Sequence, residues 1–334
     1  MTEHDIATRQ LGRTGLEVSA TGLGCWPIGG VMIRDGQQVG YTGGDDAESL
    51  RAVATAVELG VTLFDTADAY GAGHSERLLG QALAGHPEVR VATKFGNTID
   101  ESTRELTGTD TSPEYVRSAV HASLRRLRRE RIDLYQLHTP DVPPERAAEL
   151  VEVLEDLVTE GLIAWYGVSA AEPAQVEALA GPHLGVAQVE MNVLDGPSPV
   201  TAVAHRLDLG VVCRSPLAMG LLGGRHAAGQ PVPEDDVRAR PFEWLRWFRD
   251  GAPAPEFMER LDAVRGVLTR DGRSLAQGAL AWIWADDDRA VPLPGFRTVA
   301  HVTDTAGALR ARPMSAADHD EIELLLGRIP VVLR

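Results

Sequence analysis

The sequence predicts an α/β protein built on a single (β/α)8 barrel, also called a TIM barrel. Short apolar runs typical of buried strands recur at eight places, and helical patterns separate most of them. The 334 residues are enough for one such barrel, which takes roughly 250 residues plus insertions. No Gly-x-Gly-x-x-Gly motif follows the first run and opens a helix, which argues against an open dinucleotide-binding sheet. Because no linker divides the chain, residues 1–334 are expected to form one domain.

The barrel strands and two long connections can be placed along the chain. Strands are expected at residues 20–26, 62–65, 89–95, 132–138, 162–168, 186–190, 211–215 and 290–294. Residues 8–20 indicate a small N-terminal β-hairpin. Two long loops, 27–45 and 223–256, follow strands, so both are expected on the C-terminal face, where barrel enzymes hold their active sites.

Residue types also mark where helices begin and end. Ser112 and Pro113 predict the N-cap and first residue of a helix. Gly60, Gly161 and Gly210 each join a helical stretch to a strand. Each of these glycines is expected to take the left-handed conformation that ends a helix.

The composition indicates a cytoplasmic protein with no nucleic-acid or membrane partner. A net charge of -16 lacks the basic surface that phosphate backbones need. The N-terminus has no signal-peptide pattern, and no segment reaches the roughly 20 apolar residues that cross a bilayer. Cys25 and Cys213 are expected to be buried thiols. The arginine-rich run at 125–131 is expected to be a solvated helix end. The oligomeric state is not indicated.

Three successive expected strands end in, or close to, a titratable residue: Asp65, Lys94 and His138. The ends of parallel strands converge on one mouth of a barrel, and Tyr70 enters that mouth from the loop after Asp65. Taken singly, Asp65 could be an N-cap, Tyr70 a packed aromatic ring and His138 a satisfied polar group. Together, the four residues indicate one active site.

These four side chains suit carbonyl reduction, in which hydride reaches carbon and a proton reaches oxygen. Tyr70 can supply the proton, and a neighbouring Lys94 cation is expected to lower its pKa from about 10. Asp65 would keep Lys94 charged, and His138 could orient the carbonyl by a hydrogen bond. Lys94 is the only lysine among 32 basic residues, so this position specifically calls for an ammonium group.

The chain resembles the aldo-keto reductases over nearly its whole length. The segments that carry the resemblance are LGRTGLEVSATGLGCW, FDTADAYGAGHSERLLGQAL, VATKFG, SLRRLRRERIDLYQLHTPD, GLIAWYGVS, AQVEMN, SPLAMGLLGGR and SLAQGALAWIWADDDRAVPLPGFR. The resemblance implies the Tyr70, Asp65, Lys94 and His138 tetrad in the roles given above. It also implies an NADP(H) cofactor and a small-molecule carbonyl substrate.

The resemblance further implies which residues line the cofactor and substrate site. Ser169 and Gln188 would hold the carboxamide, Arg214 would stack on the nicotinamide, and Trp26 would line the substrate pocket. The implied contacts to the pyrophosphate are Ser215, Leu217, Gly220 and Arg225. The implied contacts to the adenosine 2′-phosphate and adenine are Gly295, Arg297, His301, Asp304 and Thr305.

The chain departs from the family's pattern at several of these places. Arg214 stands where an aromatic residue is usual, Ala170 where Asn is usual and Met191 where Tyr is usual. Thr139 follows the histidine in place of a bulkier residue, and Asp304-Thr305 replaces Glu-Asn. The nicotinamide and adenine contacts of this chain are therefore expected to differ from those of its relatives.

The sequence leaves two other functions open. The chain resembles bacterial members related to potassium-channel β-subunits, so a nicotinamide-binding regulatory subunit with little turnover is the alternative. A non-redox barrel enzyme that uses Lys94 as a Schiff base would leave Asp65 and Tyr70 unexplained. In segment 223–256, Trp244, Trp247 and Phe248 are expected on one helical face, either as a substrate-facing lid or as a helix packed on the barrel wall or at a subunit interface.

Overall fold

Eight parallel strands form the central sheet of the computed structural model, which describes residues 6–139 and 142–329. Their order is β16-β13-β12-β11-β10-β7-β6-β3. The strands are β3 (Leu23–Gly24), β6 (Leu63–Asp65), β7 (Arg90–Phe95), β10 (Ile132–Leu137), β11 (Ile163–Ser169), β12 (Leu184–Glu190), β13 (Gly210–Arg214) and β16 (Ala290–Pro292). Each overlaps a segment where a strand was predicted. The domain bounds at 1 and 334, and the end of the motif after Thr139, lie outside the described residues.

The first and last strands close the sheet into a barrel. Gly24 forms a parallel bridge with Gly295, and its amide donates to the Pro294 carbonyl at 3.0 Å. A Cβ atom on Gly24 would lie 2.9 Å from the Leu293 carbonyl oxygen, so only glycine permits this approach. The predicted eight-stranded barrel is confirmed.

The barrel is a packed core rather than a channel. Its interior cluster is formed by Leu11, Val18, Leu63, Ala92, Leu134, Val186, Val212, Val291 and Leu293, all buried. Leu11 and Val18 come from the predicted N-terminal hairpin, β1 (Thr8–Gln10) and β2 (Glu17–Ser19), which pair antiparallel. Because the Arg13 amide bonds the Asp208 carbonyl just before β13, the hairpin covers the end of the barrel where the strands begin.

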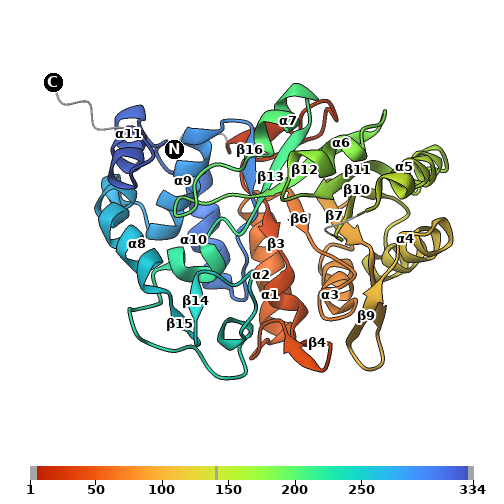
Figure 1. Cartoon of the computed structure of the whole chain (residues 1–334), viewed down its shortest axis with the longest axis horizontal. Coiled ribbons are helices and arrows are strands. Elements are labelled where there is room, and N and C mark those ends of the chain that lie inside the picture. Colours follow the sequence, from red (N-terminus) through yellow and green to blue (C-terminus); the bar gives the residue numbers. More distant parts are fainter. Residues whose placement is uncertain (1–5, 140–141, 330–334) are drawn as a thin grey trace.

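Helices surround the strands, as Figure 1 shows. They are α1 (Trp26–Gly29), α2 (Asp46–Glu58), α3 (His74–Ala82), α4 (Pro113–Leu127), α5 (Pro144–Thr159), α6 (Pro173–Ala178), α7 (Thr201–Arg206), α8 (Pro255–Leu268), α9 (Leu275–Asp286), α10 (Val299–Gly307) and α11 (Ala316–Leu325), with 3-10 turns η1 (Ala218–Gly223), η2 (Val237–Ala239), η3 (Arg270–Gly272) and η4 (Ala308–Arg310). Ser112 caps α4 as predicted, because its side chain accepts from the Tyr115 amide. Within residues 6–139 and 142–329, no helix combines the length and apolar character that a membrane crossing needs.

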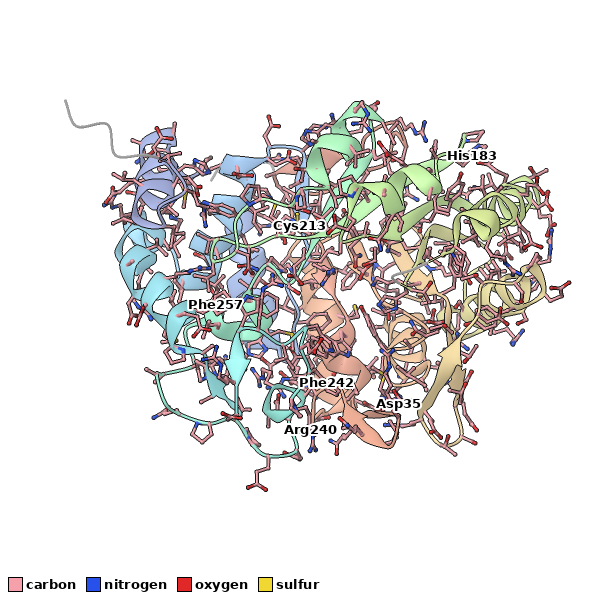
Figure 2. All side chains as sticks on the ribbon, in the orientation of Figure 1. Asp35, His183, Cys213, Arg240, Phe242 and Phe257 are labelled. Atoms are coloured by element: carbon pink, nitrogen blue, oxygen red, sulfur yellow. The ribbon has the colours of Figure 1, made fainter. Side chains whose placement is uncertain are left out.

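The two long loops carry more regular structure than the sequence indicated. Segment 27–45 contributes β4 (Met32–Arg34) and β5 (Gln37–Val39), which join β8 (Asn97–Asp100) and β9 (Glu105–Thr109) in a separate sheet. Segment 223–256 contains β14 (Phe248–Arg249) and β15 (Ala252–Pro253). These small strands lie along the lower edge of Figure 1, and Figure 2 shows Asp35 and Phe242 at the same edge.

Two local expectations were wrong. Gly60 and Gly161 have positive φ as predicted, but at the third joint the left-handed residue is Asp208 and not Gly210. Gly210 instead permits close packing, since a Cβ atom there would lie 2.9 Å from Leu11 Cβ. Residues 244–248 form no helix, so Trp244, Trp247 and Phe248 do not share a helical face.

The arginine-rich run is also not simply solvated. The side chain of Arg126 is buried, and its Nε lies 2.5 Å from the carboxylate of Glu76, which is fully buried. Burial alone would lower the pKa of Arg126, but Glu76 and neighbouring carboxylates hold it above its ordinary value. This residue therefore ties the end of α4 to α3.

Candidate functional site

Four elements bring the predicted tetrad together at the C-terminal mouth of the barrel. Asp65 ends β6, Lys94 lies in β7, and His138 directly follows β10. Tyr70 lies in the loop between β6 and α3, against which α1 packs closely: a Cβ atom on Gly71 would lie 1.9 Å from the Gly29 carbonyl oxygen. Two facing glycines thus let α1 support the Tyr70 loop.

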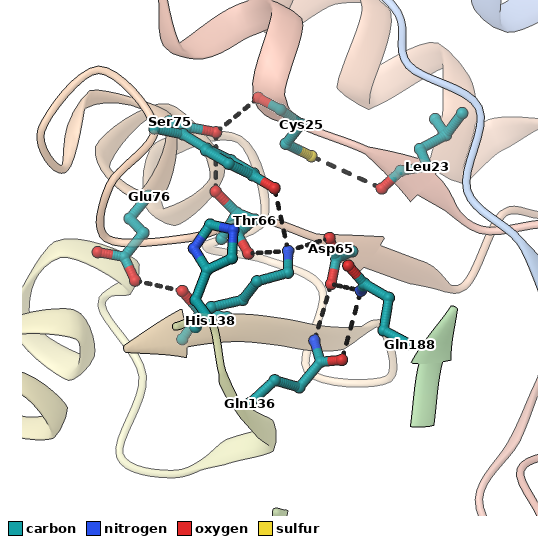
Figure 3. Close-up of polar contacts among 12 residues, drawn as sticks. Leu23, Cys25, Asp65, Thr66, Ser75, Glu76, Gln136, His138 and Gln188 are labelled. Atoms are coloured by element: carbon teal, nitrogen blue, oxygen red, sulfur yellow. Dashed lines mark hydrogen bonds and ion pairs between the residues drawn. The ribbon is translucent and has the colours of Figure 1, made fainter. Parts of the chain in front are cut away.

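Lys94 is the centre of a set of polar contacts, and two of its partners, Asp65 and Thr66, are labelled in Figure 3. Its side chain is fully buried, and Nζ forms an ion pair with Asp65 Oδ2. Nζ also donates to the Thr66 carbonyl at 2.8 Å and to the Tyr70 hydroxyl oxygen at 3.2 Å. All three ammonium protons therefore have acceptors. Because the Tyr70 oxygen accepts from Lys94, its own proton is available to another acceptor.

The protonation of this pair follows from burial and charge. Burial alone would lower the pKa of Lys94, but Asp65 and Tyr70 reverse the direction and raise it above its ordinary value. Burial raises the pKa of Tyr70, and the Lys94 cation opposes that rise without cancelling it. The expected lowering of the Tyr70 pKa is thus not found, because loss of hydration outweighs the attraction of the ammonium group. Tyr70 is protonated at neutral pH, as a proton donor must be.

His138 stands edge-on to Tyr70, with the two ring centroids 5.8 Å apart. Burial, followed by the charges of Lys94 and Arg214, lowers the pKa of His138 to about 3. The imidazole is therefore neutral at physiological pH. Its Nδ1 lies 3.3 Å from Nδ2 of Asn97, which is the first residue of β8.

A large cavity opens in front of Tyr70 and His138. Its volume is about 1320 Å³, and both long loops contribute to its walls. Every residue predicted for the site lines it except Lys94, which lies behind Tyr70 and Asp65: the lining set is Trp26, Asp65, Tyr70, His138, Ser169, Gln188, Arg214, Ser215, Leu217, Gly220, Arg225, Gly295, Arg297, His301, Asp304 and Thr305.

Basic groups gather in one part of this cavity wall. Burial lowers the pKa of His301, and the charges of Arg225 and Arg297 lower it further, so the three side chains lie within one local field. The Arg297 amide bonds His301 Nδ1 at 3.3 Å, and Arg297 Nη1 donates to the Thr42 carbonyl at 3.0 Å. In a chain with a net charge of -16, this concentration of cations favours an anionic ligand.

Comparison with known proteins identifies the family of this chain. Residues 22–326 match the model of the Aldo/keto reductase family. The chain belongs to the aldo/keto reductase family. The protein from Glycine max named "Probable aldo-keto reductase 1" is 31% identical over 329 residues, which span 96% of this chain and 89% of that protein.

Solved structures agree with this assignment. The holo form of aldo-keto reductase AKR11C1 from Bacillus halodurans has a TM-score of 0.74 and 28% identity, with 96% of each chain covered. The glycerol dehydrogenase AKR11B4 from Gluconobacter oxydans has a TM-score of 0.79 and 26% identity, with 99% of each chain covered.

In this aldo/keto reductase, Arg214 is tied to its neighbours rather than free in the cavity. Its Nη1 lies 2.6 Å from Glu190 Oε2, and the other oxygen of Glu190 pairs with Arg246. Arg246 Nε also lies 3.1 Å from Asp195, whose second oxygen accepts from Trp247 Nε1 at 2.9 Å. These bonds fasten segment 223–256 to the ends of β12 and β13.

Two polar residues of the site were missed from the sequence. Asn97 comes directly after the VATKFG segment, and nothing in the sequence around it indicates a role in the site. Gln136 could have been found, because it lies two residues before His138 and two after Leu134. A strand alternates its faces, so this spacing places Gln136 on the inward face of β10.

Proposed function

We propose that this aldo/keto reductase reduces the carbonyl group of a small aldehyde or ketone, with NADPH as the reductant and Tyr70 as the proton donor. The observation that supports this best is the contact chain from Asp65 through Lys94 to Tyr70, which ends at the cavity wall. A bound NADPH supplies hydride to the carbonyl carbon. The protein's own residues must then protonate the oxygen and hold the substrate.

The residues present fit such a cofactor. The 1320 Å³ cavity is larger than a small carbonyl compound requires, and the cations Arg225 and Arg297, with the neutral His301 beside them as a hydrogen-bonding group, suit phosphate groups. Ser169 and Gln188 would hold the carboxamide, and Ser215, Leu217 and Gly220 the pyrophosphate. Gly295, Asp304 and Thr305 would complete the adenosine contacts, while Trp26 would face the substrate.

Each member of the tetrad has a distinct proposed task. Tyr70 gives its proton to the developing alkoxide, and the Lys94 cation stabilises the phenolate that remains. Asp65 keeps Lys94 charged and in place. Neutral His138 donates a hydrogen bond to the carbonyl oxygen and orients it toward Tyr70.

Burial argues against the Schiff-base alternative. Lys94 has no exposed surface, and its nitrogen is already engaged by three oxygen atoms. A carbonyl carbon from the cavity would have to displace Tyr70 to reach it. Borohydride trapping of Lys94 with a carbonyl substrate is therefore expected to give no adduct.

The function is tested by steady-state turnover of NADPH with a panel of aldehydes and ketones, together with Lys94→Arg and Tyr70→Phe. Lys94→Arg keeps the charge but cannot fit a planar guanidinium where a compact ammonium lay. Both variants are expected to lose about 10²- to 10⁴-fold in kcat while NADPH binding persists. A wild-type protein that binds NADPH without turnover would instead support the regulatory-subunit alternative, and near-native kcat in Lys94→Arg would refute the tetrad's roles.

A further inference from the structure

Gln136 is a buried polar residue in the middle of the barrel that the roles above leave unexplained. Its side chain has no exposed surface. It stands beside Lys94 in the sheet, since Gln136 of β10 is in register with Lys94 of β7. The residue two positions earlier, Leu134, belongs to the apolar interior cluster. An amide at such a place is costly unless each of its polar atoms is bonded.

Both polar atoms of Gln136 are bonded, one to the Asp65 carboxylate and the other to Gln188, which itself bonds the same carboxylate. Gln136 Nε2 donates to Asp65 Oδ1 at 2.9 Å, and Gln136 Oε1 accepts from Gln188 Nε2 at 3.3 Å. Gln188 Nε2 also donates to the same Asp65 oxygen at 2.8 Å. An ionised carboxylate only accepts, so both glutamines must turn their NH2 groups toward it. Figure 3 shows the side chains of Gln136 and Gln188 together beside Asp65.

The neighbouring strand makes room for this side chain. Gly167 of β11 is in register with Gln136, and a Cβ atom on Gly167 would lie 3.2 Å from Gln136 Cγ. The same Cβ atom would lie 2.8 Å from the Val186 carbonyl oxygen. The space that Gln136 occupies is thus bounded by backbone, which restricts its side chain.

We propose that Gln136 is a positioning residue that holds the Asp65 carboxylate in the orientation that pairs its other oxygen with Lys94. The two oxygens of Asp65 are divided between two tasks: Oδ1 takes the glutamine amides and Oδ2 takes the ammonium group. This rests on the proposed function in one respect. If Gln188 also holds the cofactor's carboxamide, its bond to Asp65 is weakened in the complex, and Gln136 remains as the dedicated donor.

Because Lys94 is the only lysine of the chain, it can be observed alone by NMR. Protein without cofactor, labelled with ¹⁵N at the lysine side chain, gives one ammonium signal at neutral pH. The variants are Gln136→Met, which keeps the length of the side chain but removes its donor, and Gln136→Leu as a second apolar replacement. Leu134→Met is the matched control, since it places the same new side chain on the same face of β10, two residues before Gln136 and within the apolar interior cluster.

With Gln136 replaced, Asp65 is held by one donor fewer, and its pairing with Lys94 loosens. We expect a displaced ¹⁵N signal and ammonium hydrogen exchange about three- to tenfold faster in both Gln136 variants, the range that corresponds to loss of one hydrogen bond. The signal of Leu134→Met is expected to match wild type. A wild-type signal in the Gln136 variants, or an equal change in Leu134→Met, would overturn the proposal.

Turnover with NADPH gives a second, separable readout. The Gln136 variants are expected to lose about three- to tenfold in kcat, with the KM for substrate and the Kd for NADPH unchanged, because Gln136 acts through Asp65 and Lys94 and not on a ligand. A loss confined to KM or to NADPH binding would contradict the positioning role. If wild-type protein reduces no carbonyl compound, the proposed function fails, but the lysine signal still decides the role of Gln136.

Discussion

The amide nitrogen of Asn97 lies 3.3 Å from Nδ1 of His138, and this contact bears on which imidazole nitrogen carries the proton. A neutral histidine has one donor and one acceptor nitrogen. If Asn97 donates to Nδ1, the proton resides on Nε2, where it can be given to a substrate oxygen. Asn97 is held from behind, because its carbonyl accepts from the Tyr115 hydroxyl at 2.6 Å.

Replacement of Asn97 by Ala is expected to lower kcat/KM by about two- to tenfold, which corresponds to one neutral hydrogen bond. The ¹⁵N shifts of His138 measure the tautomer directly and should show a fall in the Nε2-protonated form. Thr98→Ala, at the next position of β8, is the control. Unchanged tautomer populations in Asn97→Ala would show that the contact does not select the proton's position.

The low pKa of His138 predicts a specific pH dependence of stability. Its pKa is about 3 in the folded protein and about 6.5 in an unfolded chain. Between these values the unfolded chain binds more protons, so this contribution to stability grows as pH rises toward 6.5 and is lost as pH falls. We expect the melting temperature of wild type to drop more steeply between about pH 7.5 and about pH 5 than that of His138→Asn. Parallel curves would mean that the pKa of His138 is not lowered in the folded protein.

The two tryptophans of segment 223–256 differ sharply in environment. Trp247 is 1% exposed and bonds Asp195, whereas Trp244 is 45% exposed, stacks on Phe242 at 5.4 Å and lies 6.0 Å from Trp26. Trp247→Ala is therefore expected to cost about 3–5 kcal/mol of stability. Trp244→Ala should alter the KM for substrate with little change in melting temperature. Differential scanning calorimetry and kinetics on both variants check this, and a stable Trp247→Ala protein would contradict the assigned burial.

Arg297 is predicted to set the preference for NADPH over NADH. Its guanidinium lies in the basic part of the cavity wall and packs 5.7 Å from the centre of the Tyr41 ring. Loss of a hydrogen bond to a charged group costs about 1.5–3 kcal/mol, so Arg297→Ala should reduce the NADPH/NADH ratio of kcat/KM about tenfold or more. Arg289→Ala, which removes an arginine paired with Asp208 outside the cavity, should leave the ratio unchanged. If both variants keep the wild-type ratio, Arg297 does not bind the 2′-phosphate.

The sequence was sufficient for the barrel because each strand is encoded locally. The runs VTLFD, VATKF and DLYQL are apolar over their own length, and the strand ends then place Asp65, Lys94 and His138 without further information. The sheet of β4, β5, β8 and β9 could not be predicted in this way. Its pairing joins Ile33 to Glu105 across more than seventy residues, and these strands are mostly polar.

The contacts of side chains were harder to predict than the backbone elements, because they too depend on residues far apart in the chain. The expectation for Trp247 assumed a helical period in a segment rich in Pro and Gly, but Asp195, which lies far away in the chain, draws its indole inward. Lys94 was recognised from its place near the end of a strand and from being the only lysine of the chain. The Tyr70 pKa was misjudged because a charge can be read from the sequence, whereas the depth of burial that opposes it cannot.

The last prediction concerns Arg214, which lines the cavity and also forms an ion pair with Glu190. A guanidinium can stack on a neutral dihydronicotinamide but repels the positive ring that follows hydride transfer. The ion pair with Glu190 at 2.6 Å partly neutralises that charge. Arg214→Tyr should therefore tighten NADP+ relative to NADPH, and Glu190→Gln should shift the same ratio of Kd values in the opposite direction. Each change is expected to be about fivefold, on the order of 1 kcal/mol for a partly exposed charge.

Asp195→Asn separates this electrostatic effect from a loosened loop. Asp195 and Glu190 both pair with Arg246, and Asp195 also accepts a hydrogen bond from Trp247. Among the residues that the structure describes, Asp195 forms no ion pair with Arg214. If the charge on Arg214 governs the ratio, Asp195→Asn should weaken both cofactor forms equally or not at all. If instead Glu190 acts by fastening segment 223–256 over the cavity, Asp195→Asn and Glu190→Gln should change the ratio alike. Fluorescence titration of the three variants with both forms decides between charge and closure, and equal ratios in Arg214→Tyr and wild type would exclude stacking by Arg214.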